Sequence, residues 1–264
     1  MTAIDFHTHA FPDGLAPRAI AALEAKCPWK AVDKGTVTAL VKSMDRSDID
    51  VSVVCPIATK SDQVEGILLW CAKIRCDRID PLPSVHPDTH DAAGWIAKFH
   101  QHGFAGIKLH PMYQDFVVDE PRMDAIYQAC SDHGLFITSH CGHDIAFDPT
   151  DDCAAPERFR RVLEKFPNLK LVCTHMGGWR DWDAAESEII GTRAYIETSF
   201  SLSDLGPKRA AELITRHGYK RVFFGTDWPW ADQKKELALL HKLPLPKEQI
   251  DAILWNNAAS LLGL

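Results

Sequence analysis

Asp5-Phe6-His7-Thr8-His9 opens the chain and decides how the rest of it is interpreted. Side chains two residues apart on a β-strand point to the same face, so an extended segment over residues 3–9 would place the imidazoles of His7 and His9 side by side. By itself such a pair can arise by chance. Here it ends a short apolar run and precedes Phe11-Pro12-Asp13-Gly14, a turn signal. We therefore expect half of a metal site where a buried strand opens into a loop.

The composition is that of an ordinary globular protein. Of 264 residues, 46% are apolar and 25% are charged, which is enough to bury a substantial core. The formal net charge of −7 argues against a surface for nucleic acid or anionic membrane. No apolar run reaches the roughly 18 residues of a membrane-spanning helix. We expect a cytoplasmic protein with a small-molecule substrate, no nucleic-acid partner and no membrane partner; the sequence leaves a homo-oligomer open.

The eight cysteines are scattered along the chain without a C-x-x-C pair. Reduced and mostly buried thiols are expected in a chain of this size that shows no export signal. Cys141 follows a histidine at an expected strand end, so it is the cysteine that could line a site.

Short apolar runs alternate with segments of helical period along the whole chain, which is typical of βαβ units and a parallel sheet. This count and length predict an α/β fold, a single-domain (β/α)8 TIM barrel over residues 1–264 with its active site at the C-terminal ends of the strands. A doubly wound open sheet competes, but no glycine-rich phosphate loop follows the first strand. The expected strands are 3–9, 50–55, 79–85, 104–109, 135–139, 169–174, 194–198 and 221–225, and the expected helices are 16–26, 36–48, 61–75, 88–102, 121–133, 156–166, 181–190, 204–217, 234–242, 246–254 and 257–262.

Histidines are concentrated at the expected strand ends. With 13 histidines in 264 residues, the two positions at each of the eight expected strand ends should together hold roughly one histidine by chance. Six stand there, together with a lysine and an aspartate: His7, His9, His86, Lys108, His110, His140, His175 and Asp227.

Five ordered motifs carry a resemblance to a known family. They are D-F-H-T-H at 5–9, G-I-K-L-H-P at 106–111, T-S-H-C-G at 138–142, C-T-H-M-G-G at 173–178 and G-T-D-W-P at 225–229. Together they resemble the amidohydrolase superfamily, and most closely its amidohydrolase-related (amidohydrolase 2) branch of metal-dependent hydrolases and decarboxylases. The resemblance spans the chain and is specific for family and fold, and much less so for substrate.

The resemblance implies one divalent metal, bound by His7 and His9 from the first strand, His140 from the fifth and Asp227 from the eighth. Three neutral imidazoles and a carboxylate suit zinc, with an open position for water or substrate. Manganese and iron accept the same ligands. The alternative is a carboxylated Lys108 that bridges two metals, as in other branches of the superfamily.

Asp227 and His175 are the expected catalytic residues. Asp227 would hold the metal and accept a proton from a water whose pKa the metal lowers. His175 matches the strand-six histidine of the family, which polarises the substrate or helps to move a proton. The alternative role for His175 is hydrogen-bonding support of the metal ligands.

Four residues are expected to bind substrate. Lys108 and His110 are two apart on the fourth strand, so both should face the barrel interior. Lys108 would bind a substrate carboxylate or carbonyl oxygen, or else form a buried ion pair. Arg180 could grip a carboxylate, and Trp228 would shape the pocket beside Asp227; an exposed loop position and simple packing are their alternatives.

These residues suit a metal-dependent hydrolase that uses a metal-activated water to cleave a C–O or C–N bond in a small carboxylated lactone, ester or amide. The alternative is a non-oxidative decarboxylase (carboxy-lyase) of the aminocarboxymuconate-semialdehyde decarboxylase type, which would use the same residues to protonate carbon. A binding protein without turnover is a third hypothesis, and the intact ligand set argues against it.

Overall fold

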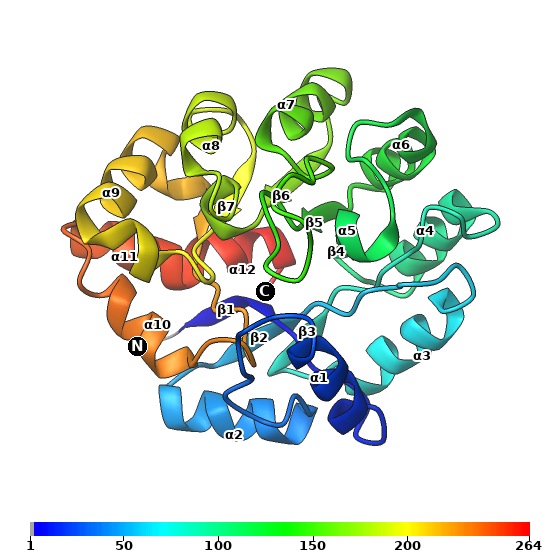
Figure 1. Cartoon of the computed structure of the whole chain (residues 1–264), viewed down its shortest axis with the longest axis horizontal. Helices are drawn as coiled ribbons and strands as arrows, with labels where there is room; N and C mark the ends of the chain where they lie inside the picture. The colour runs from blue at the N-terminus through cyan, green and yellow to red at the C-terminus, as the bar shows by residue number, and fades with distance from the viewer. Residues whose placement is uncertain (1–2) are drawn as a thin grey trace.

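A computed structural model describes residues 3–264 and arranges them as parallel strands surrounded by helices (Figure 1). Every expected strand is present, with ends that differ by a few residues. The strands are β1 (Ile4–Thr8), β2 (Val51–Val54), β3 (Ile79–Pro81), β4 (Gly106–Leu109), β5 (Phe136–Ser139), β6 (Lys170–Cys173), β7 (Tyr195–Glu197) and β8 (Val222–Phe223).

The strands pair in the orders β1-β2-β3 and β4-β5-β6-β7-β8. Backbone hydrogen bonds join these two sheets at both junctions. Phe6 N donates to Phe224 O at 2.8 Å, which links β1 to the end of β8, and Lys108 N donates to Pro83 O at 2.9 Å, which links β4 to the residues after β3. The strand series therefore closes as the predicted TIM barrel requires.

The helices flank the strands in chain order, and local signals set several of their ends. The Thr36 hydroxyl accepts a hydrogen bond from Ala39 N at 3.1 Å at the start of α2, and Gly134 ends α6 in the left-handed region at φ 71°. The helices are α1 (Ala16–Glu24), α2 (Val37–Ser47), α3 (Val64–Ile74), α4 (Ala92–Gln101), α5 (Pro111–Gln114), α6 (Asp124–His133), α7 (Pro156–Lys165), α8 (Trp182–Glu188), α9 (Leu202–His217), α10 (Gln233–Leu240), α11 (Lys247–Asp251) and α12 (Asn257–Leu262), with short helical turns at Pro121–Met123, His175–Gly177 and Tyr219–Arg221 and a π-helical stretch at Ala252–Asn256.

Three differences from the sequence-based expectation have local causes. The third strand ends at Pro81 rather than at residue 85, because Pro81 and Pro83 have no N–H for a sheet. The eighth strand ends at Phe223, since Phe224 N donates to Ile253 O of the π-helical stretch at 3.0 Å. Helix α5 has only four residues, too few to show a helical period in the sequence.

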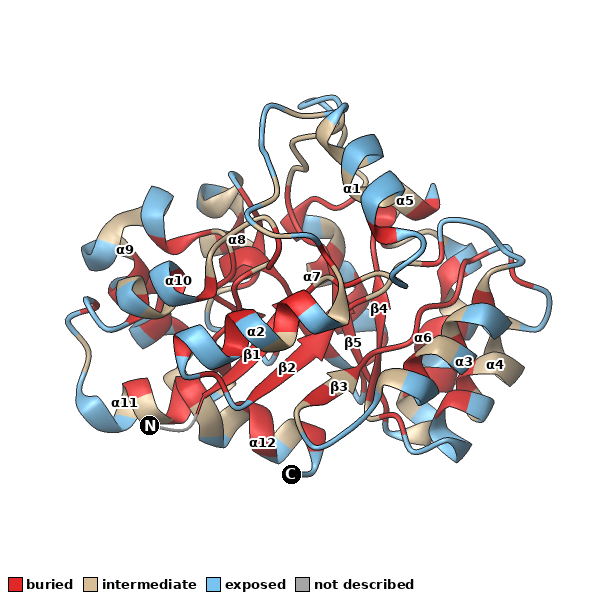
Figure 2. Cartoon of the chain, turned by 90° about the horizontal axis from the view of Figure 1, so that it is seen from below, coloured by how far each residue is buried: buried red, intermediate tan, exposed pale blue. Residues whose placement is uncertain are grey.

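The barrel interior below the strand ends is packed with aromatic and aliphatic side chains. The Phe6 ring of β1 lies 4.4 Å from the Phe223 ring of β8 and 5.7 Å from the Phe136 ring of β5, centroid to centroid. Helix α12 adds apolar side chains to this cluster. Figure 2 shows the buried strands in the centre, α12 at one end, and α1 and α5 at the other. The end of the barrel beside α12 is therefore filled by apolar side chains. This leaves the opposite end, at the C-terminal ends of the strands, for a polar site.

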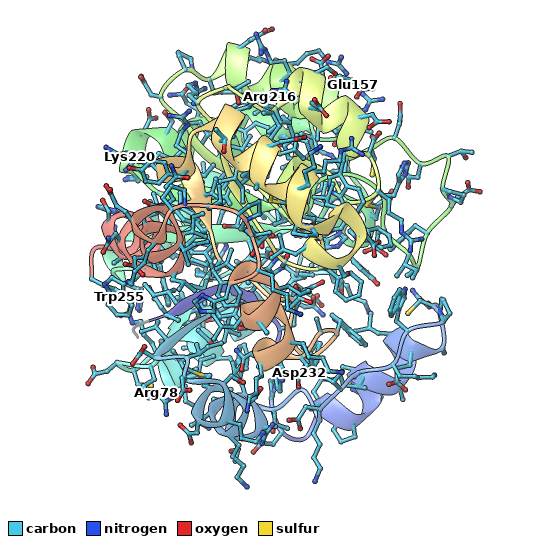
Figure 3. The ribbon with its side chains drawn as sticks, turned by 90° about the vertical axis from the view of Figure 1, so that its left-hand side faces the viewer. Arg78, Glu157, Arg216, Lys220, Asp232 and Trp255 are labelled. Carbon is cyan, nitrogen blue, oxygen red and sulfur yellow. The ribbon has the colours of Figure 1, made fainter. Side chains whose placement is uncertain are left out.

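Charged side chains cover the outside of the molecule (Figure 3). Arg78 pairs with Asp45 at 2.6 Å, and Arg216 pairs with Glu186 on the neighbouring helix α8. Within residues 3–264, no helix combines the length and apolar character needed to span a membrane.

Candidate metal centre and substrate cavity

An irregularity in β1 turns two consecutive side chains into the barrel. Phe6 contacts the rings of β5 and β8, and the next residue, His7, contacts Glu197 of β7 at 3.1 Å. Regular alternation would send neighbours to opposite faces. The register of β1 against β2 shifts between Asp5 and Thr8, as at a β-bulge, and such bulges re-aim side chains. His7 therefore lies directly above the apolar layer.

Asp5 points away from the interior and joins the ends of β1 and β8. Its Oδ2 accepts hydrogen bonds from Thr226 Oγ1 at 2.6 Å and Gln233 Nε2 at 2.8 Å, and its Oδ1 accepts from Thr226 N at 3.0 Å. Burial raises the pKa of Asp5 to about 7, although these hydrogen bonds oppose the rise. Because Thr226 precedes Asp227, this network fixes Asp227 relative to β1.

His7, His9 and Asp227 converge on one point. His7 Nδ1 lies 3.1 Å from Glu197 Oε1, and His9 Nδ1 lies 2.9 Å from the Cys55 carbonyl oxygen. Each Nδ1–H therefore donates outward, and each Nε2 turns its lone pair to the centre. The two Nε2 atoms lie 3.1 Å apart, and Asp227 Oδ1 lies 3.1 Å from His9 Nε2 and 3.6 Å from His7 Nε2.

This donor set fits a divalent metal. Atoms bound to a tetrahedral zinc at about 2.0–2.1 Å stand about 3.3–3.4 Å from one another, close to the spacings among His7, His9 and Asp227. Two imidazole lone pairs and a carboxylate oxygen directed at one point repel each other, and a cation between them removes this repulsion. The carboxylate behind His7 and the carbonyl behind His9 are the usual supports of metal-binding histidines.

His140, the fourth ligand that the resemblance implies, contacts His175 rather than His7, His9 or Asp227. His140 Nδ1 lies 3.1 Å from His175 Nε2, while His140 Nε2 lies 2.8 Å from the His143 carbonyl oxygen. The His175 ring lies 4.9 Å from the His140 ring and 5.2 Å from the His7 ring. Burial lowers the pKa of His140 to about 3 and that of His175 to about 4, so both imidazoles are neutral, as ligands must be.

Lys108 lies inside the barrel at the same floor. Its Nζ is 3.1 Å from His7 Nε2, and its side chain is fully buried. Burial lowers the pKa of Lys108, although Cys55 and Asp227 oppose the change. None of the ion pairs formed within residues 3–264 includes Lys108, so the structure does not contain the alternative ion pair considered for it.

Glu197 supports the candidate metal centre through its contact with His7, and the sequence analysis gave it no role. Besides His7, its Oε1 accepts hydrogen bonds from Ser199 Oγ at 2.7 Å and His175 N at 2.9 Å, and its Oε2 accepts from Ser199 N at 2.6 Å. The side chain is fully buried. An acidic residue inside the short buried seventh strand was the available signal.

Backbone conformations that only glycine adopts readily cluster around this centre. His175, Met176, Phe200 and Asp227 have φ values of 58°, 58°, 55° and 68° at the ends of β6, β7 and β8. Such left-handed residues persist where surrounding contacts hold them, often at functional sites. Gly225 allows a close approach, since a Cβ there would lie 2.3 Å from Glu197 Oε2.

A cavity of about 840 Å³ opens above the centre, within the size range of small-molecule sites. His110 lies on its wall and stacks on His140 with ring centroids 4.3 Å apart, and His110 Nε2 lies 3.3 Å from Asp144 Oδ2. Burial lowers the pKa of His110 to about 4, although Asp144 opposes the change. The sequence indicates that the loop over residues 141–155 could shape a pocket, as part of it does here, but it gives Asp144 itself no role because no recognisable motif surrounds it.

Two predicted substrate contacts lie away from this cavity. The Trp228 ring is 1% exposed within the core and does not line the cavity, so packing, its alternative role, matches what is observed. Trp230 from the same loop lines the cavity instead. Arg180 is also absent from the lining; its half-exposed side chain places Nε 3.7 Å from Asp204 Oδ2.

Cys141, expected as the cysteine that could line the site, is buried, with its Sγ 3.0 Å from the Gly177 carbonyl oxygen. Cys141 does not border the cavity. The cysteine that does is Cys55, directly after β2. Burial raises the pKa of the Cys55 thiol to about 12, so this thiol stays protonated.

Comparison with known proteins agrees with the fold. A family model described as Amidohydrolase matches residues 4–264. No curated protein matches the sequence. An uncharacterized TIM-barrel protein from Bordetella bronchiseptica is 20% identical, with 100% of this chain and 99% of that chain covered and a TM-score of 0.78.

Two further solved structures that the chain resembles are named after an enzymatic activity. One is 5-carboxyvanillate decarboxylase from Sphingomonas paucimobilis, with 16% identity, coverage of 100% of this chain and 99% of that chain, and a TM-score of 0.74. The other is a probable 2-pyrone-4,6-dicarboxylic acid hydrolase from Acinetobacter baumannii, with 15% identity, 100% of both chains and a TM-score of 0.70. At these identities the likeness shows a shared fold, and the TIM-barrel prediction is confirmed.

Proposed function

We propose, since the chain belongs to the amidohydrolase family, that it is a metal-dependent hydrolase that cleaves a C–O or C–N bond in a small lactone, ester or amide. Two solved structures that the chain resembles are named as a decarboxylase and a probable hydrolase, and both names support a reaction of one of these two kinds. The cofactor in this proposal is one divalent metal, with zinc favoured and manganese or iron accepted by the same ligands.

The observation that carries the proposal is the convergence of His7, His9 and Asp227 at the floor of the cavity. His7 is 1% exposed and the Asp227 side chain 17%, so the carboxylate is the ligand most open to the cavity. A divalent ion held there supplies a Lewis acid that polarises a substrate carbonyl and makes a water more acidic.

Asp227 lies at the cavity floor as a carboxylate that can accept the proton of the attacking water. Burial alone would raise its pKa, but the neighbouring histidines lower the pKa by more than burial raises it, so the group is ionised, which is the state that can accept a proton. The oxygen of the water bonds to the acyl carbon, the bond to the leaving group breaks, and the proton passes from Asp227 to the leaving oxygen or nitrogen. His175, beside the ligands, is placed to orient the substrate oxygen.

Decarboxylation is the second candidate, and Lys108 favours it. Lys108 is buried, lies 3.1 Å from His7 and forms no ion pair with a carboxylate in the described part of the chain, so it suits a substrate carboxylate. In this reaction the C–C bond to that carboxylate breaks, carbon dioxide leaves, and the carbon receives a proton that comes from solvent and passes through Asp227 or His175. The resemblance to 5-carboxyvanillate decarboxylase supports this reaction without deciding for it.

One experiment separates the two reactions. Protein loaded with zinc, manganese or iron is incubated with a panel of lactones and esters and, separately, with hydroxybenzoic and keto acids, while acid release and carbon dioxide release are followed. The hydrolase proposal expects acid release without carbon dioxide. Carbon dioxide release with no hydrolysis across the panel would overturn it in favour of decarboxylation.

A further inference from the structure

The walls of the cavity differ sharply from its floor. Eight of the lining residues are aromatic, and they surround a floor made of histidines, Lys108 and Asp227. Two aromatic pairs stabilise the upper wall: the Trp29 and Phe200 rings lie 5.3 Å apart, and the Tyr113 and Phe147 rings lie 4.9 Å apart. A ligand that fills this cavity therefore meets polar groups at one end and rings along the rest of its length.

Apolar side chains at the mouth are exposed in the free protein. Leu15 is 37% exposed and Trp29 is 40% exposed, and both line the cavity. They lie on or beside α1, which Figure 2 shows raised above the strand ends at the end opposite α12. Exposed apolar surface next to a site gains from being covered by an apolar ligand.

Cations are scarce along the upper wall. Among the described residues that line the cavity there is no arginine, and the lysines are Lys108 at the floor and Lys26 at the rim. Lys26 is exposed and lies over the Tyr113 ring, with Nζ 5.9 Å from the centroid, so water already solvates it and a pair with it gains little. The lining also carries Asp62, which would repel a second anion.

We propose that the substrate carries an apolar body of aromatic size and a single carboxyl or carbonyl group, which lies at the floor beside Lys108. This rests on the proposed function, because the reacting group is placed at His7, His9 and Asp227. A second carboxylate on the far end would be buried among rings without a cation, which is unfavourable. Arg180, which could have held such a group, lies outside the cavity.

The proposal distinguishes this chain from one of the proteins it resembles. The substrate in the name of the Acinetobacter baumannii protein carries two carboxylic acids, and a second carboxylate directed along the upper wall would meet no arginine among the described lining residues here. The expected substrates are therefore monoanionic or neutral aryl or bulky alkyl compounds.

Binding of unreactive acids tests the proposal without any turnover. Quenching of tryptophan fluorescence, with calorimetry as a second measurement, compares 3-phenylpropanoate, 3-(4-carboxyphenyl)propanoate and butanoate on the metal-loaded protein. We expect 3-phenylpropanoate to bind at least tenfold more tightly than either of the other two. The second acid adds a carboxylate at the far end, and the third removes the ring.

A charge-insertion variant checks where the far end lies. Leu23 is a partly buried residue of α1 that lines the cavity, and Leu23→Arg should improve binding of the dicarboxylate relative to 3-phenylpropanoate at least tenfold. Leu69→Arg is the matched control, since Leu69 is 63% exposed on α3 and lies outside the lining, and its preference should equal that of the unmodified protein.

The proposal is overturned if the dicarboxylate or butanoate binds as tightly as 3-phenylpropanoate, if 3-phenylpropanoate does not bind at millimolar concentration, or if Leu23→Arg leaves the preference unchanged. Failure of the proposed hydrolase function is a separate result. Selective binding of the aryl acid combined with carbon dioxide release would remove the hydrolase and leave the substrate class standing.

Discussion

Replacing Glu197 by glutamine should weaken metal binding about ten- to a hundredfold, the usual effect of losing the carboxylate behind a metal-binding histidine. Glu197 Oε1 is the atom that accepts from His7 Nδ1, and the same oxygen accepts from Ser199 Oγ and His175 N. The variant tests whether this carboxylate sets the direction of the His7 lone pair.

The geometry decides how glutamine would fit. With its oxygen in the Oε1 position, its amide group would face Ser199 N across the present 2.6 Å contact, so two donors would meet. With the amide reversed, the amide group would face His7, Ser199 Oγ and His175 N instead. The first orientation costs less, and it still leaves one buried donor unpaired, at about 1–3 kcal/mol of stability. A tenfold loss of metal affinity corresponds to about 1.4 kcal/mol.

Zinc affinity is measured by competition with a chromophoric chelator, and thermal unfolding of the chelator-stripped protein shows whether the variant folds. Glu164→Gln is the matched control, because Glu164 is 62% exposed on α7 and forms an ion pair with Arg160 on the same helix. The control should bind zinc as the unmodified protein does. A folded Glu197→Gln protein with an affinity within threefold of the original would refute the assignment of Glu197 as the group that orients His7.

Three further predictions concern the ligands, acid stability and packing. His7→Ala and Asp227→Ala should each abolish stoichiometric metal binding in elemental analysis; full stoichiometry in both would place the ligands elsewhere. Burial lowers the pKa of His217 to about 4 from 6.5 in the unfolded chain, so its contribution, up to about 3 kcal/mol, is present above pH 6.5 and is lost as pH falls through 4. His217→Gln should therefore show a shallower loss of stability over this range in denaturant titrations, and an unchanged slope would contradict this. Gly225→Ala should destabilise the fold by about 1–3 kcal/mol, because its Cβ would lie 2.3 Å from a buried carboxylate oxygen, whereas Gly66→Ala, with open space around it, should not lower the melting temperature; equal melting temperatures would contradict the clash.

The order and number of elements could be predicted because each depends on nearby residues. Apolar runs and helical periods marked every strand and the long helices, and Gly134 ended α6 where expected. The differences from the predicted elements have two causes: a distant contact overrides the local signal, or the element is too short to show one. β8 is short because Phe224 bonds to a segment about thirty residues later, and α5 is too short to leave a pattern.

The residues of the candidate site also divide into those that the sequence indicates and those that it does not. Histidines at strand ends could be found from the sequence, since parallel strands in a barrel bring their C-terminal ends together. The roles of Glu197 and Asp144 could not be predicted in this way. An acidic residue in a buried strand marks Glu197 as unusual, but its role depends on His7, which is 190 residues away in the chain. Arg180 and Trp228 were placed near the ligands in sequence, but side-chain direction put them elsewhere.

The spacing in D-F-H-T-H, with the apolar run that it ends and the turn signal that follows it, predicted that two imidazoles would stand together at the end of a buried strand, because that outcome depends on strand geometry and short-range order. Tertiary structure alone decided that His7 turns inward beside Phe6, through the register shift in β1, and that Glu197 and the Cys55 carbonyl fix the tautomers of His7 and His9. It also decided that the cavity above them is aromatic and poor in cations. The physical reason is that lone-pair direction and cavity lining arise from contacts between residues far apart in the chain, which no local pattern records.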